Sequence, residues 1–297
     1  MSESAISLAP FAAVRPRRHP FAGFVSRMRR NRLGMVGLVL VVLVGLVAVF
    51  APWIAPYPPN DTLVRRLSPP SGQFLLGSDD FGRDVLSRLI YGARVSFYVG
   101  FVSVGIALTF GSLAGLVAGY FGRHVDNVIM RIADVMFSIP PIVLAIAITA
   151  ILGPSLTNAM VAIGIVYTPS FARVVRGPVL AIKETQYIEA AHTVGASSLR
   201  IIFKHLLPNV TAPLIVQTTF NLSTAILTES TLSFLGLGIQ PPDPSWGTML
   251  SVGRVYMELA WWLAIFPGLA IMISVMGFNL LGDGLRDVLD PRLRADR

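Results

Sequence analysis

Residues 135–172 read VMFSIPPIVLAIAITAILGPSLTNAMVAIGIVYTPSFA, a run of 38 positions without a charged side chain. As one helix rising about 1.5 Å per residue, this run would be close to twice as long as the hydrocarbon core of a bilayer, about 30 Å, is thick. Gly153-Pro154-Ser155 supplies a turn near its middle. The stretch therefore predicts two membrane-spanning helices that fold back on each other. We expect kinks or ends at Pro140-Pro141 and Pro169, because proline removes a backbone donor.

Four more apolar runs extend this pattern over the chain. They lie at Leu33–Phe50, Val95–Gly122, His205–Pro242 and Leu259–Gly282, and only the third contains a charge, Glu229. A composition of 54% hydrophobic and 13% charged residues is typical of a protein in a bilayer. We therefore expect an all-α polytopic membrane protein with about six transmembrane helices.

The first apolar run follows a basic segment, which is also the pattern of a signal peptide. The run is longer than the usual apolar region of such peptides, about 7–15 residues. Pro52 also follows Ala51, where cleavage would fall. We interpret the run as a retained span.

Basic residues predict the orientation of the spans. With the amino terminus inside, eighteen of the 24 Lys and Arg residues fall in cytoplasmic segments. The positive-inside rule then places both termini in the cytoplasm. The same bias explains the net charge of +8, so we expect contact with membrane lipid and no nucleic acid.

The sequence lacks the motifs of several enzyme classes. It contains no cysteine, and its four histidines show no metal-ligand spacing, so we expect no metal site and no thiol chemistry. We find neither the phosphate-binding G-x-x-x-x-G-K-[ST] run nor the G-x-S-x-G and H-E-x-x-H motifs of hydrolases. The chain is therefore expected to bind no cofactor and not to be an enzyme by itself.

The longest predicted cytoplasmic connection joins spans four and five, and it indicates two short helices. Residues 183–194 are good helix formers, and Gly195 is placed to end this helix in the left-handed conformation. Ser197 or Ser198 can cap the second helix, residues 199–207. For an arbitrary membrane protein, an amphipathic hairpin on the membrane surface would explain this pattern.

The order of residues in this connection favours another interpretation. Glu189-Ala190-Ala191, then Gly195, then Leu207-Pro208 resembles the EAA loop of binding-protein-dependent ABC import permeases. In those families the loop sits in a cleft of the cytoplasmic ATPase and transmits nucleotide-driven closure. The resemblance implies that these six residues form an ATPase-docking loop. His205 departs from the pattern, since many families place isoleucine there.

Motifs elsewhere narrow the resemblance to the second, C-type permease subunit of dipeptide, oligopeptide and nickel importers. They lie at residues 32–35, 76–88, 232–238 and 279–291. The resemblance implies a type I ABC importer permease fold in the cell inner membrane, with half of the translocation pathway in this chain. It also implies a heterodimer with a related permease, two ATPase subunits that hydrolyse ATP with Mg, and an extracytoplasmic solute-binding protein.

Peptides are the cargo that this resemblance favours, with chelated nickel and glutathione as alternatives in the same family. An ion-coupled secondary transporter is the alternative from another functional class, but such a transporter would leave the EAA-like loop without a function. The implied division is a basic cytoplasmic segment (1–32), a first helix with its outer loop (33–94), a core permease domain (95–281) with the docking loop at about 183–208, and a cytoplasmic tail (282–297).

The predicted fifth span carries a stripe of polar side chains. Spacings of four and three residues place them on one helix face: Gln217, Asn221, Thr224, Thr228 and Thr231. A polar stripe in hydrocarbon must face another helix or water. Our hypothesis is that it borders the translocation path. For Glu229, in the same span, we favour a structural hydrogen bond over a role as a charge-dependent gate.

Three further features concern helix packing and the outer loops. A face of small residues in span two predicts close helix contact: Ser103, Ala107, Gly111, Gly115 and Gly119. Arg131 and Asp134 are spaced to pair on one helix. In the outer loops, Asp80, Arg83 and Trp246 are candidate contacts for the binding protein, although solvated connectors carry such residues too.

Overall fold

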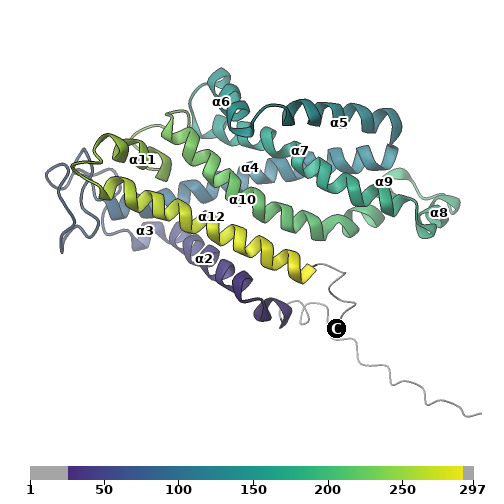
Figure 1. Cartoon of the computed structure of the whole chain (residues 1–297), viewed down its shortest axis with the longest axis horizontal. Helices are drawn as coiled ribbons and strands as arrows, with labels where there is room; N and C mark the ends of the chain where they lie inside the picture. The colour runs from purple at the N-terminus through teal and green to yellow at the C-terminus, as the bar shows by residue number, and fades with distance from the viewer. Residues whose placement is uncertain (1–25, 290–297) are drawn as a thin grey trace, which may run out of the picture.

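The computed structural model describes residues 26–289, and these residues form helices and loops without a β-strand. Long helices run side by side along the long axis of the molecule (Figure 1). The main elements are α2 (Arg32–Val49), α4 (Val85–Phe121), α5 (Arg123–Phe137), α6 (Pro141–Leu152), α7 (Leu156–Lys183), α8 (Gln186–Thr193), α10 (Thr211–Phe234), α11 (Trp246–Val255) and α12 (Trp262–Leu289). Most of the predicted basic amino-terminal segment and the last eight residues lie outside the described part.

The prediction of about six spans is confirmed. Five helices are long and apolar enough to cross a membrane, and α5 with α6 makes the sixth only as a bent pair. The axes of α5 and α6 meet at 92°. The break falls at Ser138–Pro140, immediately before Pro141, as the proline pair predicted. Pro169, by contrast, lies inside α7, which continues past it to Lys183.

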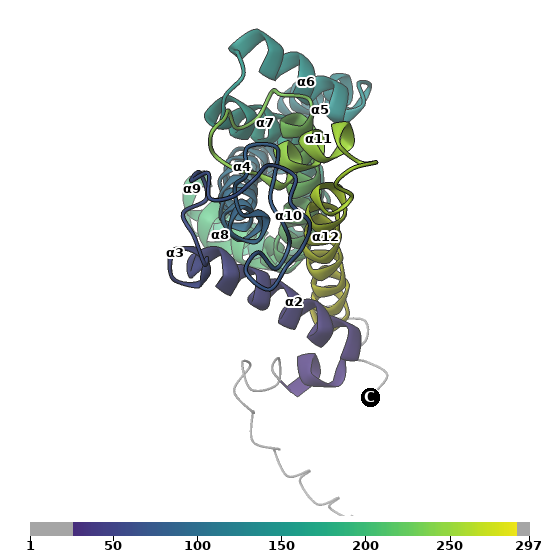
Figure 2. The same cartoon turned by 90° about the vertical axis from the view of Figure 1, so that its left-hand side faces the viewer.

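Small residues of α4 form its contact with α7, as the sequence predicted. A Cβ added at Gly111 or Gly115 would collide with the backbone of α7, and one at Gly119 would lie 2.6 Å from Val179 Cγ1. Figure 2 shows α4, α7 and α10 in the middle of the bundle, with α2 at one edge and α6 at the opposite edge. These glycines therefore set the spacing of the central helices.

The helix α2 packs along α12 through glycines that the sequence analysis did not single out. A Cβ at Gly34 would lie 2.8 Å from the Cα of Gly284. Asn31 caps α2 through the Gly34 N–H at 2.9 Å, and its amide donates to Asp287 at 2.9 Å. The first span is therefore built into the bundle.

Several helices extend beyond the charge-free runs that predicted them. The helix α4 begins at Val85, not Val95, because Asp84 caps it through the Ser87 N–H at 2.8 Å. The domain boundary at residue 94 therefore falls inside a helix. Likewise α7 runs eleven residues beyond Ala172, and α12 continues past the boundary at 282 to Leu289. The short helix α11 was not predicted.

The two ends of the bundle differ in content. The loop of residues 55–84 and α11 lie at the left end of Figure 1, and α8 lies at the right end. The start of α2 and the end of α12 lie toward the same end as α8. This arrangement agrees with the predicted orientation, in which α8 and both termini are cytoplasmic.

Candidate functional site

The helix α8 is a short arm held by one buried side chain. Ile188 is buried in the core, whereas Glu189 and Ala190 are exposed and Ala191 is half-buried. Because only one face of α8 is covered, most of the EAA-like segment is open to a partner.

A glycine turn ends this arm as predicted. Gly195 has a φ of +79°. Its N–H donates to His192 O at 2.9 Å, and the Ala196 N–H donates to Ala191 O at 3.0 Å. Ser197 then caps the next helical segment by accepting from the Arg200 N–H. A Cβ at Gly195 would meet no atom within 4 Å, so the glycine serves the backbone and leaves open space outside the turn.

The chain from Ser198 to Phe234 is one helical run with three geometries. A π-helical segment, Ile201–Leu206, is followed by a 3₁₀ turn, Leu207–Val210, and then by α10. The Leu207 N–H bonds to Ile202 O, five residues back, and Pro208 has no N–H to continue an α-helix. Pro208 therefore changes the helical geometry and does not end the helix.

Large apolar side chains stand exposed around this turn. Val194 is 83% exposed, and Tyr187, Leu199 and Phe203 are also exposed. We call these four residues the tip patch. Basic Arg200 and Lys204 flank it and are exposed. An exposed apolar surface of this kind is typical of a contact with another protein or with the membrane.

The predicted polar stripe of α10 is divided between two environments. Asn221 donates to Ser170 Oγ of α7 at 3.0 Å, and Thr228 shares a hydrogen bond of 2.8 Å with Tyr167. Gln217 donates to Asn221 at 3.1 Å. Asn221 and Thr228 are therefore buried in the contact with α7, so their prediction as path-lining residues is wrong, whereas half-buried Gln217 bonds within α10.

The stripe residues outside this contact keep exposed surface. Thr224 is exposed and Thr231 is half-buried, and each hydroxyl bonds to a carbonyl of its own helix. Exposed Leu227 lies between them. The sequence could not separate the two sets, because all five side chains satisfy the same helical spacing.

Glu229 lies in a cluster of hydroxyl groups. Its side chain is fully buried and accepts hydrogen bonds from Ser233 at 2.7 Å and Ser96 at 3.2 Å, with Ser230 at 3.4 Å. Ser96 belongs to α4, so the carboxylate joins α4 to α10. This geometry supports the structural role that the sequence favoured.

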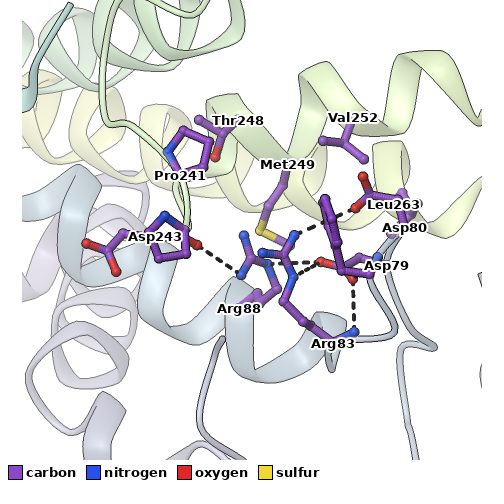
Figure 3. Close-up of a pocket in the computed structure, with 12 residues that line it drawn as sticks. Asp79, Asp80, Arg83, Arg88, Pro241, Asp243, Thr248, Met249, Val252 and Leu263 are labelled. Carbon is purple, nitrogen blue, oxygen red and sulfur yellow. Dashed lines mark hydrogen bonds and ion pairs between the residues drawn. The ribbon is translucent and has the colours of Figure 1, made fainter. Parts of the chain in front are cut away.

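A cavity of about 400 Å³ lies at the other end of the molecule, and we call it the outer pocket. Its lining combines charged groups with the apolar side chains of Met249, Val252 and Leu263 (Figure 3). Asp79 accepts from Arg83 Nε at 2.6 Å and lies 3.3 Å from Arg88 Nε. The two guanidinium groups therefore share one carboxylate.

Arg88 links three segments that are distant in sequence. Its Nη1 donates to Pro59 O at 2.9 Å, Asn60 Oδ1 at 3.1 Å and Pro242 O at 3.3 Å. A charged side chain in the predicted loop is thus a buried connection between the two outer loops.

The structure places the three predicted binding-protein contacts in different surroundings. Asp80 and Arg83 line the outer pocket, 3.6 Å apart between Oδ1 and Nη2. Burial is the main cause that raises the pKa of the Asp80 carboxyl, followed by the charge of Asp79. Trp246 is only 2% exposed and donates to Leu89 O at 2.9 Å, so its prediction as a surface anchor is wrong. It fills the space beside Gly92, where no Cβ would fit.

Two ion pairs that the sequence did not predict join α5 to α7. Asp134 accepts from Arg173 at 2.8 Å and does not pair with Arg131. Asp126 accepts from Arg176 Nη2 at 2.6 Å. Both connections cross between helices, and sequence spacing detects only partners on the same helix.

Comparisons with known proteins match nearly the whole chain. The model of the binding-protein-dependent transport system inner membrane component family matches residues 111–295. The N-terminal TM domain of oligopeptide transport permease C matches residues 19–70.

Curated relatives agree with these family matches. The dipeptide transport system permease protein DppC of Alkalihalophilus pseudofirmus is 48% identical, covering 96% of this chain and 93% of its own. The DppC of Haemophilus influenzae is 42% identical over 99% and 100%. Among solved structures, an inward-facing MetNI methionine ABC transporter matches with a TM-score of 0.54 at 24% identity, over 68% of this chain and 96% of that one. This last likeness concerns the fold alone.

Proposed function

The chain belongs to the family of binding-protein-dependent transport system inner membrane components, and on this premise we propose what each end of the molecule does. It is a multi-pass inner-membrane permease subunit of an ABC importer. The ion-coupled secondary carrier is therefore left without support.

The cytoplasmic loop receives an ATPase subunit in this proposal. The observation that carries it is an anchored arm, α8, whose turn leaves the tip patch exposed. The docking surface comprises Glu189, Ala190, Ala191 and Gly195, and Leu207-Pro208 connects it to α10. Closure of the ATPases on ATP and Mg would then move α10 through the π-helical and 3₁₀ segments.

The remaining partners complete the transporter. A related permease forms the other half of the pathway, and two ATPase subunits bind the cytoplasmic face. The open face of α10, with Thr224 and Thr231, borders the path and offers uncharged hydrogen-bonding groups. The rim of the outer pocket, with Asp80 and Arg83, faces the solute-binding protein.

Short peptides are the cargo we propose. The relatives carry the names of dipeptide, di/tripeptide and glutathione permeases. Glutathione is itself a tripeptide, so it falls within the same class. Chelated nickel, the other alternative, has no such support among these names.

Reconstitution tests the proposal. The chain, the neighbouring permease, the ATPases and the binding protein would be placed in proteoliposomes and supplied with a labelled dipeptide. We expect uptake that needs both ATP and the binding protein. Uptake that continues without ATP, driven by an ion gradient, would contradict the proposal.

A further inference from the structure

The outer pocket contains donors that its own hydrogen bonds leave unused. The Arg88 side chain is 7% exposed, and its Nε and Nη1 are engaged by Asp79 and three outer-loop oxygens. Its Nη2 has no hydrogen-bond partner among the described residues. Arg83 is bound through Nε, and its Nη2 lies 3.6 Å from Asp80, too far for a hydrogen bond. Two guanidinium groups thus present spare N–H groups beneath Met249 (Figure 3).

The same cavity contains an unused acceptor. Within the described residues the Asp80 carboxylate accepts no side-chain hydrogen bond, and its Oδ1 is buried without a partner. Asp79, by contrast, accepts from two backbone N–H groups and from Arg83. An enclosed carboxylate oxygen without a hydrogen-bond partner is costly, so an ammonium group beside Asp80 Oδ1 would stabilise it.

The charges of the pocket determine what kind of ligand fits. Four charges face one another across the cavity, with Asp79 and Asp80 beside Arg83 and Arg88. The third acidic lining residue, Asp243, points its carboxylate away from the two guanidinium groups (Figure 3), and this carboxylate accepts from Asn60 Nδ2 at 3.3 Å. A purely cationic or anionic ligand would therefore leave one charge of the four uncompensated. A zwitterion adds no net charge and meets both the spare donors and the spare acceptor. The apolar wall of Met249, Val252 and Leu263 can cover a side chain, and about 400 Å³ is within the usual size of small-ligand sites.

We propose that the outer pocket binds a zwitterionic amino acid or short peptide, with its carboxylate on Arg83 and Arg88 and its ammonium group at Asp80. The inference rests on the proposed function for its biological role, as a site that holds cargo on the extracytoplasmic face. The recognition itself rests on the pocket alone.

The test uses the intact transporter in nanodiscs without its binding protein. Binding of alanyl-leucine would be titrated by saturation-transfer NMR and compared with N-acetyl-alanyl-leucine and alanyl-leucine amide, each of which lacks one charge. We expect saturable binding of the dipeptide and at least tenfold weaker binding of both analogues. No saturable binding, or equal binding of all three compounds, would overturn the proposal.

Two variants of α11 locate the site. Val252→Trp fills the pocket without removing a charge, whereas Val255→Trp adds the same bulk at an exposed position of the same helix. We expect at least a tenfold loss of dipeptide binding for the first and no change for the second. Asp80→Asn should also weaken the binding of alanyl-leucine, because it removes the charge that faces the ammonium group. Unchanged binding to Val252→Trp would contradict the proposal.

Uptake measurements distinguish a failure of the pocket proposal from a failure of the proposed importer function. If ATP- and binding-protein-dependent uptake is present and the pocket binds no dipeptide, only the pocket proposal fails. If the dipeptide binds and uptake needs no ATP, the importer mechanism fails and the pocket remains a dipeptide site. Co-purification of the Val252→Trp chain with the neighbouring permease and the ATPases would show that the variant is assembled.

Discussion

The outer and cytoplasmic ends of this protein differ in how their connecting segments are held in place. At the outer end Trp246 is 2% exposed, and buried Arg88 connects two loops by donating to Pro59 O and Pro242 O. At the cytoplasmic end Val194 is 83% exposed, and a single buried side chain, Ile188, anchors α8. The connection between the outer loops is therefore made by several contacts within the chain, whereas α8 has one anchor and exposed apolar residues around its turn.

This difference predicts where substitutions act. Changes at the outer end should affect the stability of the folded chain, because they remove contacts within it. Changes at the docking loop should leave the chain folded and affect the coupling to ATP hydrolysis.

The largest effect is expected for Trp246→Ala. The indole fills the space beside Gly92 and donates to Leu89 O, so its removal leaves a cavity and deletes a hydrogen bond. We expect a loss of about 3–5 kcal/mol of unfolding free energy. Denaturant unfolding of the purified chain in detergent measures this loss. The matched control is Trp261→Ala, because Trp261 is exposed at the same end; an equal loss in both variants would contradict the assignment of the effect to the burial of Trp246.

A smaller effect is expected for Gly195→Trp. This variant should affect the coupling of cargo binding to ATP hydrolysis and leave the stability of the chain unchanged. The left-handed backbone of Gly195 opposes any side chain, but asparagine tolerates it best, so Gly195→Asn is the matched control. The tryptophan would project into open space where we place the ATPase. We expect at least a tenfold loss of cargo-stimulated ATP hydrolysis, about 1.4 kcal/mol, for Gly195→Trp alone. Full stimulation in that variant would mean that the loop is only a surface hairpin.

Glu229→Gln should have a modest effect. The side chain keeps its size and one acceptor for the hydroxyls of Ser96 and Ser233, so we expect about 1 kcal/mol of lost stability and uptake within twofold of the wild type. Uptake and thermal unfolding would be measured on the same preparation. Loss of uptake with normal unfolding would assign the carboxylate a charge-dependent role.

The smallest effect is expected for Asp80→Asn, and it depends on pH. Because the folded state raises the pKa of Asp80, its protonated form favours folding, and this contribution disappears as the pH rises through that raised pKa. The asparagine variant should therefore melt at a slightly higher temperature than the wild type at pH 7. The difference should shrink toward pH 4. A variant that is less stable at pH 7 would show that the contact with Arg83 outweighs burial.

The sequence predicted what depends on apolar length and on local turns. Residues 135–172 had to fold back, and Gly195 with Ser197 formed the expected turn, because these features are set by adjacent residues. The close contact of α4 with a neighbouring helix was also predictable, since Gly111 and Gly115 lie on one face of α4.

Features that depend on partners across the fold were not predictable. Arg88 resembled a loop charge, and only its contacts with Pro59 and Pro242 show that it is buried. Trp246 looked like a surface anchor because sequence carries no sign of the space beside Gly92. The polar stripe of α10 had the right spacing, but its neighbours on α7 decided which members stay open.

The docking claim is tested most directly by the accessibility of one engineered thiol. The chain has no cysteine, so Val194→Cys introduces a single reactive site within the tip patch. Val255→Cys, exposed at the outer end, is the control. Labelling rates with a soluble maleimide would be compared for the permease pair alone and with its ATPases bound. We predict that the ATPases slow labelling at residue 194 at least tenfold and leave residue 255 unchanged. Equal labelling of residue 194 in both preparations would contradict the assignment of this loop as the ATPase contact.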